Sequence, residues 1–157
     1  MIFATVGTHQ QPFERMLDGV QRLPNLTEVF VQYGYGRPPP GVGCAVAFMP
    51  FDEMEESFEA ADTVITHAGV GSILCARRVG HVPIVVPRLH ALGEHVDDHQ
   101  VELTRALAAR GAVEPVWQGE ELADAIERVP PKGSDRALSP AVGRLAEAVR
   151  AAMLDSQ

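Results

Sequence analysis

The chain has 157 residues, of which 46% are hydrophobic and 22% charged, and its formal net charge is −8 at pH 7. This length fits one domain with a single core, and the acidic balance argues against a nucleic-acid partner, whose phosphates require clustered Lys and Arg. Cys44 and Cys75 are too few for a disulfide framework. A strand pattern begins at Met1 and no apolar run approaches the ~20 residues of a membrane helix, so we expect a cytoplasmic domain without a leader peptide.

Short apolar runs alternate with helical patterns along the chain. Six runs have the character of strands, and they cover residues 2–6, 27–32, 45–49, 63–66, 83–86 and 112–116. Pro12 is expected to open the first helix and Asp52 to cap the second. Val96 is placed on the apolar face of a later helix that ends near Gly111, and the last amphipathic pattern covers residues 139–153. This alternation predicts an α/β domain with a parallel sheet covered by helices on both faces.

A Pro- and Gly-rich segment, residues 34–43, joins two of the expected strands without an intervening helix. A parallel crossover normally needs a dozen residues or more. This link is therefore either tight and extended, or one of the two strands is misplaced.

The stretch VITHAGVGS, residues 64–72, ends a buried strand in a glycine-rich turn before a helix that we expect to begin at Ser72. At such a turn, backbone N–H groups and the positive end of the helix dipole favour a phosphate. Gly69 and Gly71 allow close approach, Ser72 supplies a hydroxyl and His67 a ring N–H. The turn predicts a phosphorylated ligand, and a tight turn without a ligand is the alternative.

Other motif-based readings of this segment fit less well. The third glycine of a dinucleotide fingerprint would fall at Leu74, and no Gly-Lys-Ser/Thr follows as in a P-loop. Ser72 and Cys75 lack the G-x-S-x-G elbow of a nucleophile. His95 and His99 have the i,i+4 spacing of metal ligands on one helix face. Acidic residues at a helix start explain the same segment, and we expect no metal.

Ligands of parallel α/β sheets bind at the carboxyl ends of the strands. Four expected loops lie there, at residues 7–9, 49–52, 67–72 and 87–100. Each is also an ordinary connection between a strand and a helix, but their joint position at one edge favours a shared site.

Five motifs occur in order in these segments: TVGTH at 5–9, FDEM at 51–54, ITHAGVGSI at 65–73, PIVVPR at 83–88 and EHVDDHQ at 94–100. Together they resemble the C-terminal, donor-binding half of GT-B glycosyltransferases of the family 28 C-terminal-domain type. Small stand-alone subunits of bacterial exopolysaccharide and capsule glycosyltransferases are similar, as is the catalytic subunit of the dolichol-linked GlcNAc transferase. The resemblance implies a single domain over residues 1–157, a Rossmann-like three-layer sandwich with a mostly parallel sheet of about six strands.

The resemblance also implies a UDP-sugar site that needs neither a cofactor nor a metal. The donor-binding residues that it implies are Gly7, Thr8, Phe51, His67, Gly69, Gly71, Ser72, His99 and Gln100. Among them, Gly69, Gly71 and Ser72 match the diphosphate turn, the loop at Phe51 matches the uracil segment, and His99 with Gln100 matches the pair that contacts the hexose. His9 is a candidate general base, with a structural role in its loop as the alternative. Cys75 departs from the family, which has Glu at this position to bind the ribose.

By the same resemblance, the acceptor-binding half is a separate, membrane-anchored subunit that recruits this chain to the inner face of the membrane. The pair would transfer a hexose from a UDP-sugar to a polyprenyl-linked saccharide in exopolysaccharide or capsule synthesis. The helix at 139–153 is a candidate docking element, or it packs on its own sheet. Two alternatives remain open: a non-catalytic partner that stabilises or regulates another glycosyltransferase subunit, which Cys75 favours, and a self-assembling interaction domain with a vestigial turn.

Overall fold

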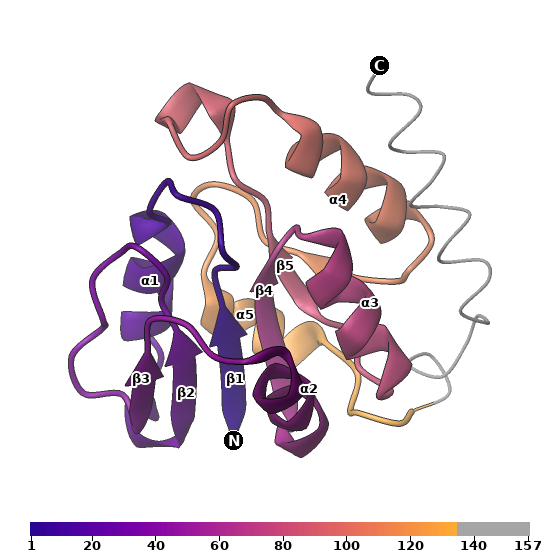
Figure 1. The fold of residues 1–157 in the computed structure, drawn as a ribbon. Helices are drawn as coiled ribbons and strands as arrows, with labels where there is room; N and C mark the ends of the chain where they lie inside the picture. The colour runs from indigo at the N-terminus through magenta and orange to yellow at the C-terminus, as the bar shows by residue number, and fades with distance from the viewer. Residues whose placement is uncertain (135–157) are drawn as a thin grey trace.

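A computed structural model describes residues 1–134, and within them six strands form one parallel sheet. The strands are β1 (Ile2–Thr5), β2 (Val29–Gln32), β3 (Cys44–Val46), β4 (Thr63–His67), β5 (Ile84–Val86) and β6 (Glu114–Pro115). They are ordered β3-β2-β1-β4-β5-β6, and every neighbouring pair is parallel (Figure 1). All six expected strands are confirmed, with shifts of up to three residues at their ends.

Helices cover both faces of this sheet and make a three-layer sandwich. The helices are α1 (Glu14–Gln21), α2 (Phe51–Ala60), α3 (Val70–Arg78), α4 (His99–Ala109) and α5 (Leu122–Arg128), with short 3-10 turns η1 (Leu26–Glu28) and η2 (His90–Leu92). Buried side chains of α1 and α5 share one cluster, whereas those of α2, α3 and α4 lie in two others. The expected Rossmann-like class is therefore confirmed. The helix expected at residues 139–153 lies outside the described residues.

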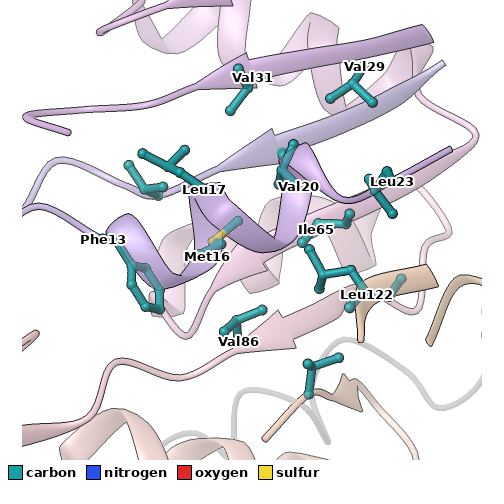
Figure 2. Packing of buried hydrophobic residues seen from close by; sticks show 14 of the residues in the cluster. Phe13, Met16, Leu17, Val20, Leu23, Val29, Val31, Ile65, Val86 and Leu122 are labelled. Atoms are coloured by element: carbon teal, nitrogen blue, oxygen red, sulfur yellow. The ribbon is translucent and has the colours of Figure 1, made fainter. Parts of the chain in front are cut away.

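The alternation of side chains along the strands decides which helix each one meets. In β4, Ile65 belongs to the cluster under α1 and α5, whereas its neighbour Val64 belongs to the cluster under α2. Figure 2 shows the first cluster, where Met16, Leu17 and Val20 of α1 lie among side chains of the sheet. Each such fully buried side chain contributes about 1.5–3 kcal/mol through removal of its apolar surface from water.

The expected starts of α1, α2 and α4 were wrong, and that of α3 was late by two residues. Helix α1 begins at Glu14 with Phe13 as its N-cap, so Pro12 precedes the helix. Pro50 is the N-cap of α2, and Asp52 lies in the first turn, where a carboxylate still favours the helix dipole. Helix α4 begins at His99, so Val96 lies in the preceding loop and is 68% exposed. Apolar spacing marks the face of a helix, but local hydrogen bonding decides where the helix begins.

The link between β2 and β3 is an extended loop, which resolves the two alternatives for residues 34–43. It returns the chain to a parallel strand without a helix, and the Gly43 N–H donates to the Leu26 carbonyl (2.9 Å) at its end. From β3 the chain then passes through α2 to β4 on the other side of β1. The strand order thus reverses between β1 and β4, and a ligand crevice is expected at their carboxyl ends.

Candidate functional site

The loops that follow β1 and β4 meet at this reversal of the strand order. Gly7 lies just beyond β1, and His67 is the last residue of β4. A Cβ atom added to Gly7 would lie 2.3 Å from His67 Nε2, and one added to Gly69 would lie 2.3 Å from His67 Cε1. The imidazole therefore fills the space that side chains at both glycines would need. Gly7 also has a φ of +81°, which favours glycine independently.

Helix α3 begins at Val70, two residues earlier than expected, with Gly69 as its N-cap. Gly71 and Ser72 therefore lie in its first turn, and the Ile73 N–H is the first to donate back, to the Gly69 carbonyl (3.0 Å). The N–H groups before Ile73 have no acceptor within the helix and are suited to an anion. A Cβ at Gly71 would meet nothing within 4 Å. Of the two glycines in the turn, Gly71 is the one that leaves open space.

Gln100, in the first turn of α4, connects this turn to the end of β5. Its Oε1 atom accepts hydrogen bonds from the backbone N–H groups of Ala68 (3.2 Å) and Arg88 (3.0 Å). Its Nε2 atom lies 3.3 Å from Nδ1 of His67. Gln100 is buried, and these contacts hold the loops after β4 and β5 together.

Burial lowers the pKa of His67 to about 3, and the neighbouring charges of Arg88, His95 and His9 act in the same direction. The ring is therefore neutral at physiological pH, so that one of its nitrogens donates and the other accepts.

Arg88 is a residue of the site whose role sequence reasoning missed. Its side chain is fully buried, and the guanidinium donates to the carbonyls of Val6 (3.0 Å), Gln11 (2.8 Å) and Glu94 (3.0 Å). Burial lowers the pKa of Arg88 to about 10, which leaves it charged at neutral pH. Arg88 thus joins the loops after β1 and β5. The available signal was a charged residue two positions after an unbroken apolar strand.

Gln32, at the end of β2, was also missed. Its Oε1 atom accepts from the Gly7 N–H (3.1 Å), and its Nε2 atom donates to the carbonyls of Gly7 (3.0 Å) and Ala47 (2.7 Å). A fully bonded buried amide of this kind fixes the conformation of the loop. The position of Gly7 is therefore set from both sides of β1.

The remaining expected residues lie around this centre. Thr8 is exposed, and the ring of His9 lies 4.8 Å from that of His95 between centroids. His9 Nδ1 accepts from the Gln11 N–H (3.1 Å), and burial, followed by the charges of His95 and Arg88, lowers the pKa of His9. Phe51 opens α2 and is 67% exposed.

The structure places Gly7, Gly69 and Gln100 around the ring of His67. Phe51, in contrast, follows β3, two strands away from β1.

Cys75 lies on α3 and packs, half-buried, against the cluster that also contacts Met54 of α2. Burial raises the pKa of the Cys75 thiol; Arg78 lowers it and Glu55 raises it to smaller extents. The thiol is therefore protonated and uncharged at neutral pH. A carboxylate, Glu55 of the neighbouring helix, lies within electrostatic range of it.

The two histidines considered as metal ligands do not share a helix face, because His95 precedes α4 and His99 begins it. Within residues 1–134, no three His, Cys, Asp or Glu side chains come together as a metal-binding group. In the same part of the chain, no helix is both long and apolar enough to cross a membrane.

The fold and these loops define a Rossmann-like α/β domain with the N-terminus of α3 at the reversal of the strand order. Residues 1–151 match the glycosyltransferase family 28 C-terminal domain, and the chain belongs to this family. It thereby corresponds to the C-terminal, donor-binding half of a GT-B glycosyltransferase, as the five motifs indicated.

Three relatives illustrate this membership. The chain is 31% identical over 122 residues to the UDP-N-acetylglucosamine transferase subunit ALG13 of Yarrowia lipolytica, covering 68% of this chain and 59% of that protein. It is 30% identical, over 117 and 129 residues, to the UDP-N-acetylglucosamine–N-acetylmuramyl-(pentapeptide) pyrophosphoryl-undecaprenol N-acetylglucosamine transferases of Syntrophus aciditrophicus and Aromatoleum aromaticum. These matches cover 74% and 79% of this chain, but the chain spans only 32% of each bacterial enzyme.

Proposed function

We propose that this chain is the donor-binding subunit of a two-component glycosyltransferase that moves a hexose from a UDP-sugar to a polyprenyl-linked saccharide in exopolysaccharide or capsule synthesis. The observation that carries the proposal is the open N-terminus of α3 at Gly71, beside the neutral imidazole of His67, at the reversal of the strand order. The names of the relatives support it, because they specify UDP-N-acetylglucosamine as donor and, for the bacterial enzymes, a pyrophosphoryl-undecaprenol acceptor.

In this proposal, the diphosphate of the donor binds at the first turn of α3. The N–H groups of Gly71 and Ser72, the Ser72 hydroxyl and the ring N–H of His67 would donate to its oxygens, with Gly7 and Thr8 lining the other side. Neutral donors and a helix dipole stabilise the charge that develops on a departing nucleoside diphosphate. This arrangement supplies leaving-group stabilisation without a metal ion or a cofactor.

The two ends of the donor would bind in different loops. Phe51 and the start of α2 would hold the uracil, whereas His99 and Gln100 would face the hexose. Gln100 would use the second hydrogen of its Nε2 group, because the first faces His67. His9 remains a candidate base, although its Nδ1 atom already accepts a backbone hydrogen bond.

The acceptor site would come from a second, membrane-anchored subunit that recruits this chain to the cytoplasmic face of the membrane. The relatives support this division, because the Yarrowia protein is named as a subunit and the bacterial enzymes are about three times as long as the matched part.

Calorimetric titration with UDP, with GDP as the comparison, tests the donor site. We expect UDP-selective binding that Gly71→Val weakens at least tenfold, or ~1.4 kcal/mol, because the added methyl groups occupy the space beside the N–H groups of α3. Ala60→Val is the matched control, since it places the same side chain at an exposed helix position. Equal binding of GDP, or equal effects of both substitutions, would contradict the proposal.

The alternative, a non-catalytic partner of another glycosyltransferase subunit, is favoured by Cys75. If the native chain does not bind UDP but Cys75→Glu does, the domain has kept the fold and lost the donor. Hexosyl transfer by the co-purified complex that disappears with Gly71→Val would support the catalytic role.

A further inference from the structure

The hydrogen bonds of Gln100 determine which way its amide faces. Two backbone N–H groups, of Ala68 and Arg88, point at one end of this side chain, at 3.2 Å and 3.0 Å. An N–H donor must be met by an acceptor, so this end is the oxygen. The NH₂ end therefore faces His67, where it lies 3.3 Å from Nδ1.

This orientation determines the tautomer of His67. An NH₂ group has hydrogens and no acceptor capacity, so the Nδ1 atom opposite it must carry a lone pair. In a neutral ring the single proton then lies on Nε2. Gly7 and Gly69 flank the ring so closely that a Cβ atom at either would overlap it, so the ring has little space in which to turn over. Within residues 1–134, no protein group is hydrogen-bonded to Nε2.

A neutral ring suits these surroundings. The charged and titratable groups that face His67 are the buried Arg88 cation from the loop after β5 and the imidazoles of His9 and His95. Protonation of His67 would place another positive charge beside Arg88 in a desolvated position. A tautomeric donor provides a hydrogen bond without that cost.

We propose that Gln100 is a positioning residue that fixes His67 as the Nε2–H tautomer, so that His67 presents a neutral donor to an anionic oxygen at the N-terminus of α3. The tautomer itself does not depend on the ligand. Its use toward the diphosphate of a nucleotide rests on the proposed function.

Nitrogen NMR of ¹⁵N-histidine-labelled protein tests the tautomer directly, since protonated and unprotonated ring nitrogens have distinct shifts. At pH 7 without ligand, we expect His67 to carry its proton on Nε2. A proton on Nδ1, or on both nitrogens, would overturn the proposal, and this measurement needs no variant other than one lacking His67 for assignment.

Gln100→Glu tests whether Gln100 imposes the tautomer. The carboxylate has the same shape and still accepts from Ala68 and Arg88, but toward His67 it accepts instead of donating. We expect the proton to move to Nδ1, or both nitrogens to be protonated. Gln21→Glu makes the same change on the exposed surface of α1 and should leave His67 unchanged. Persistence of a neutral Nε2–H ring in folded Gln100→Glu protein would refute the role of Gln100.

Binding of UDP separates this inference from the proposed function. Where the NMR of Gln100→Glu protein shows a neutral ring with its proton on Nδ1, this substitution should raise the Kd for UDP at pH 7.5 at least tenfold. The ratio of its Kd to that of the native protein should fall as pH is lowered to 5.5, because protonation restores the Nε2–H group. The titration of UDP itself affects both Kd values equally and therefore cancels in their ratio. A ratio that stays constant between pH 7.5 and 5.5 would overturn the inference. A native protein with the expected tautomer but no affinity for UDP would refute the donor site and leave the tautomer standing.

Discussion

Substitution of Gly69 by alanine tests the packing of His67 in isolation from backbone strain. Gly69 has a φ of −83°, which alanine adopts freely, so the cost of Gly69→Ala comes from the new methyl group. That group would lie 2.3 Å from His67 Cε1. Forcing a closely packed, half-buried ring to move costs about 1–3 kcal/mol. In a protein of this size, the melting temperature should fall by roughly 3–9 °C.

Gly71→Ala is the matched comparison two residues along the chain. Its methyl group would meet nothing within 4 Å, and the residue lies in the first turn of α3. The substitution should therefore stabilise the protein by about 0.4–1 kcal/mol through the unfolded state. Urea unfolding followed by circular dichroism measures both variants, and the two changes are expected to have opposite signs.

A double-mutant cycle identifies the cause of the Gly69→Ala effect. In a His67→Ala background the ring is absent, so the cost of Gly69→Ala should fall below about 1 kcal/mol. The cost that remains comes from alanine being a poorer N-cap than glycine. If Gly69→Ala costs as much without His67 as with it, the ring is not what the glycine accommodates, and the packing argument is refuted.

Three further predictions address Arg88, the pH dependence of stability, and Cys75. Arg88→Met should destabilise the fold by at least about 3 kcal/mol in urea unfolding, since it leaves the buried carbonyl groups of Val6 and Glu94 and the partly buried one of Gln11 without this donor; a cost below 1 kcal/mol would contradict this. The pKa of His67 is about 3 in the folded chain and ordinarily 6.5, so the unfolded chain binds more protons between these values and stability falls as pH falls. From pH 7 to pH 4 this loss is roughly 3 kcal/mol, and His67→Ala should remove it from unfolding curves measured across that range. Cys75→Glu should bind UDP more tightly when combined with Glu55→Gln, because Glu55 repels a carboxylate at position 75; equal Kd values for the single and double variants would argue against this repulsion.

The strands, and the meeting of the candidate loops at one edge of the sheet, were predictable from the sequence because they depend on local patterns. Short apolar runs that alternate with helical patterns define parallel strands, and parallel strands bring their carboxyl ends to one edge of the sheet. The turn at Gly69 was correctly placed as the entrance to a helix. Its glycines, however, have different environments: Gly69 adjoins a side chain of its own loop, whereas Gly71 faces open space. Spacing alone does not distinguish these two reasons for a glycine.

The interior of the site was not predictable in the same way. The contacts of Gln32 and Arg88 join residues that are 25 and 82 positions apart in the chain. No local pattern encodes such partners, because they follow from the order of the strands. Helix starts were missed for a related reason: Val96 has the spacing of an apolar helix face, but the helix begins only at His99, after Asp98 at the N-cap position.

The buried Arg88 cation also bears on how an acidic protein attracts an anion. With a net charge of −8, the surface as a whole repels a nucleotide, whereas Arg88 and the positive end of α3 present positive potential from inside the fold. Mobile ions screen exposed charges over about 8 Å at physiological ionic strength but reach buried ones poorly. The attraction at the site should therefore persist in concentrated salt, while the long-range repulsion is screened. Added salt is expected to accelerate association with an anionic ligand, the reverse of the behaviour of sites built from surface lysines.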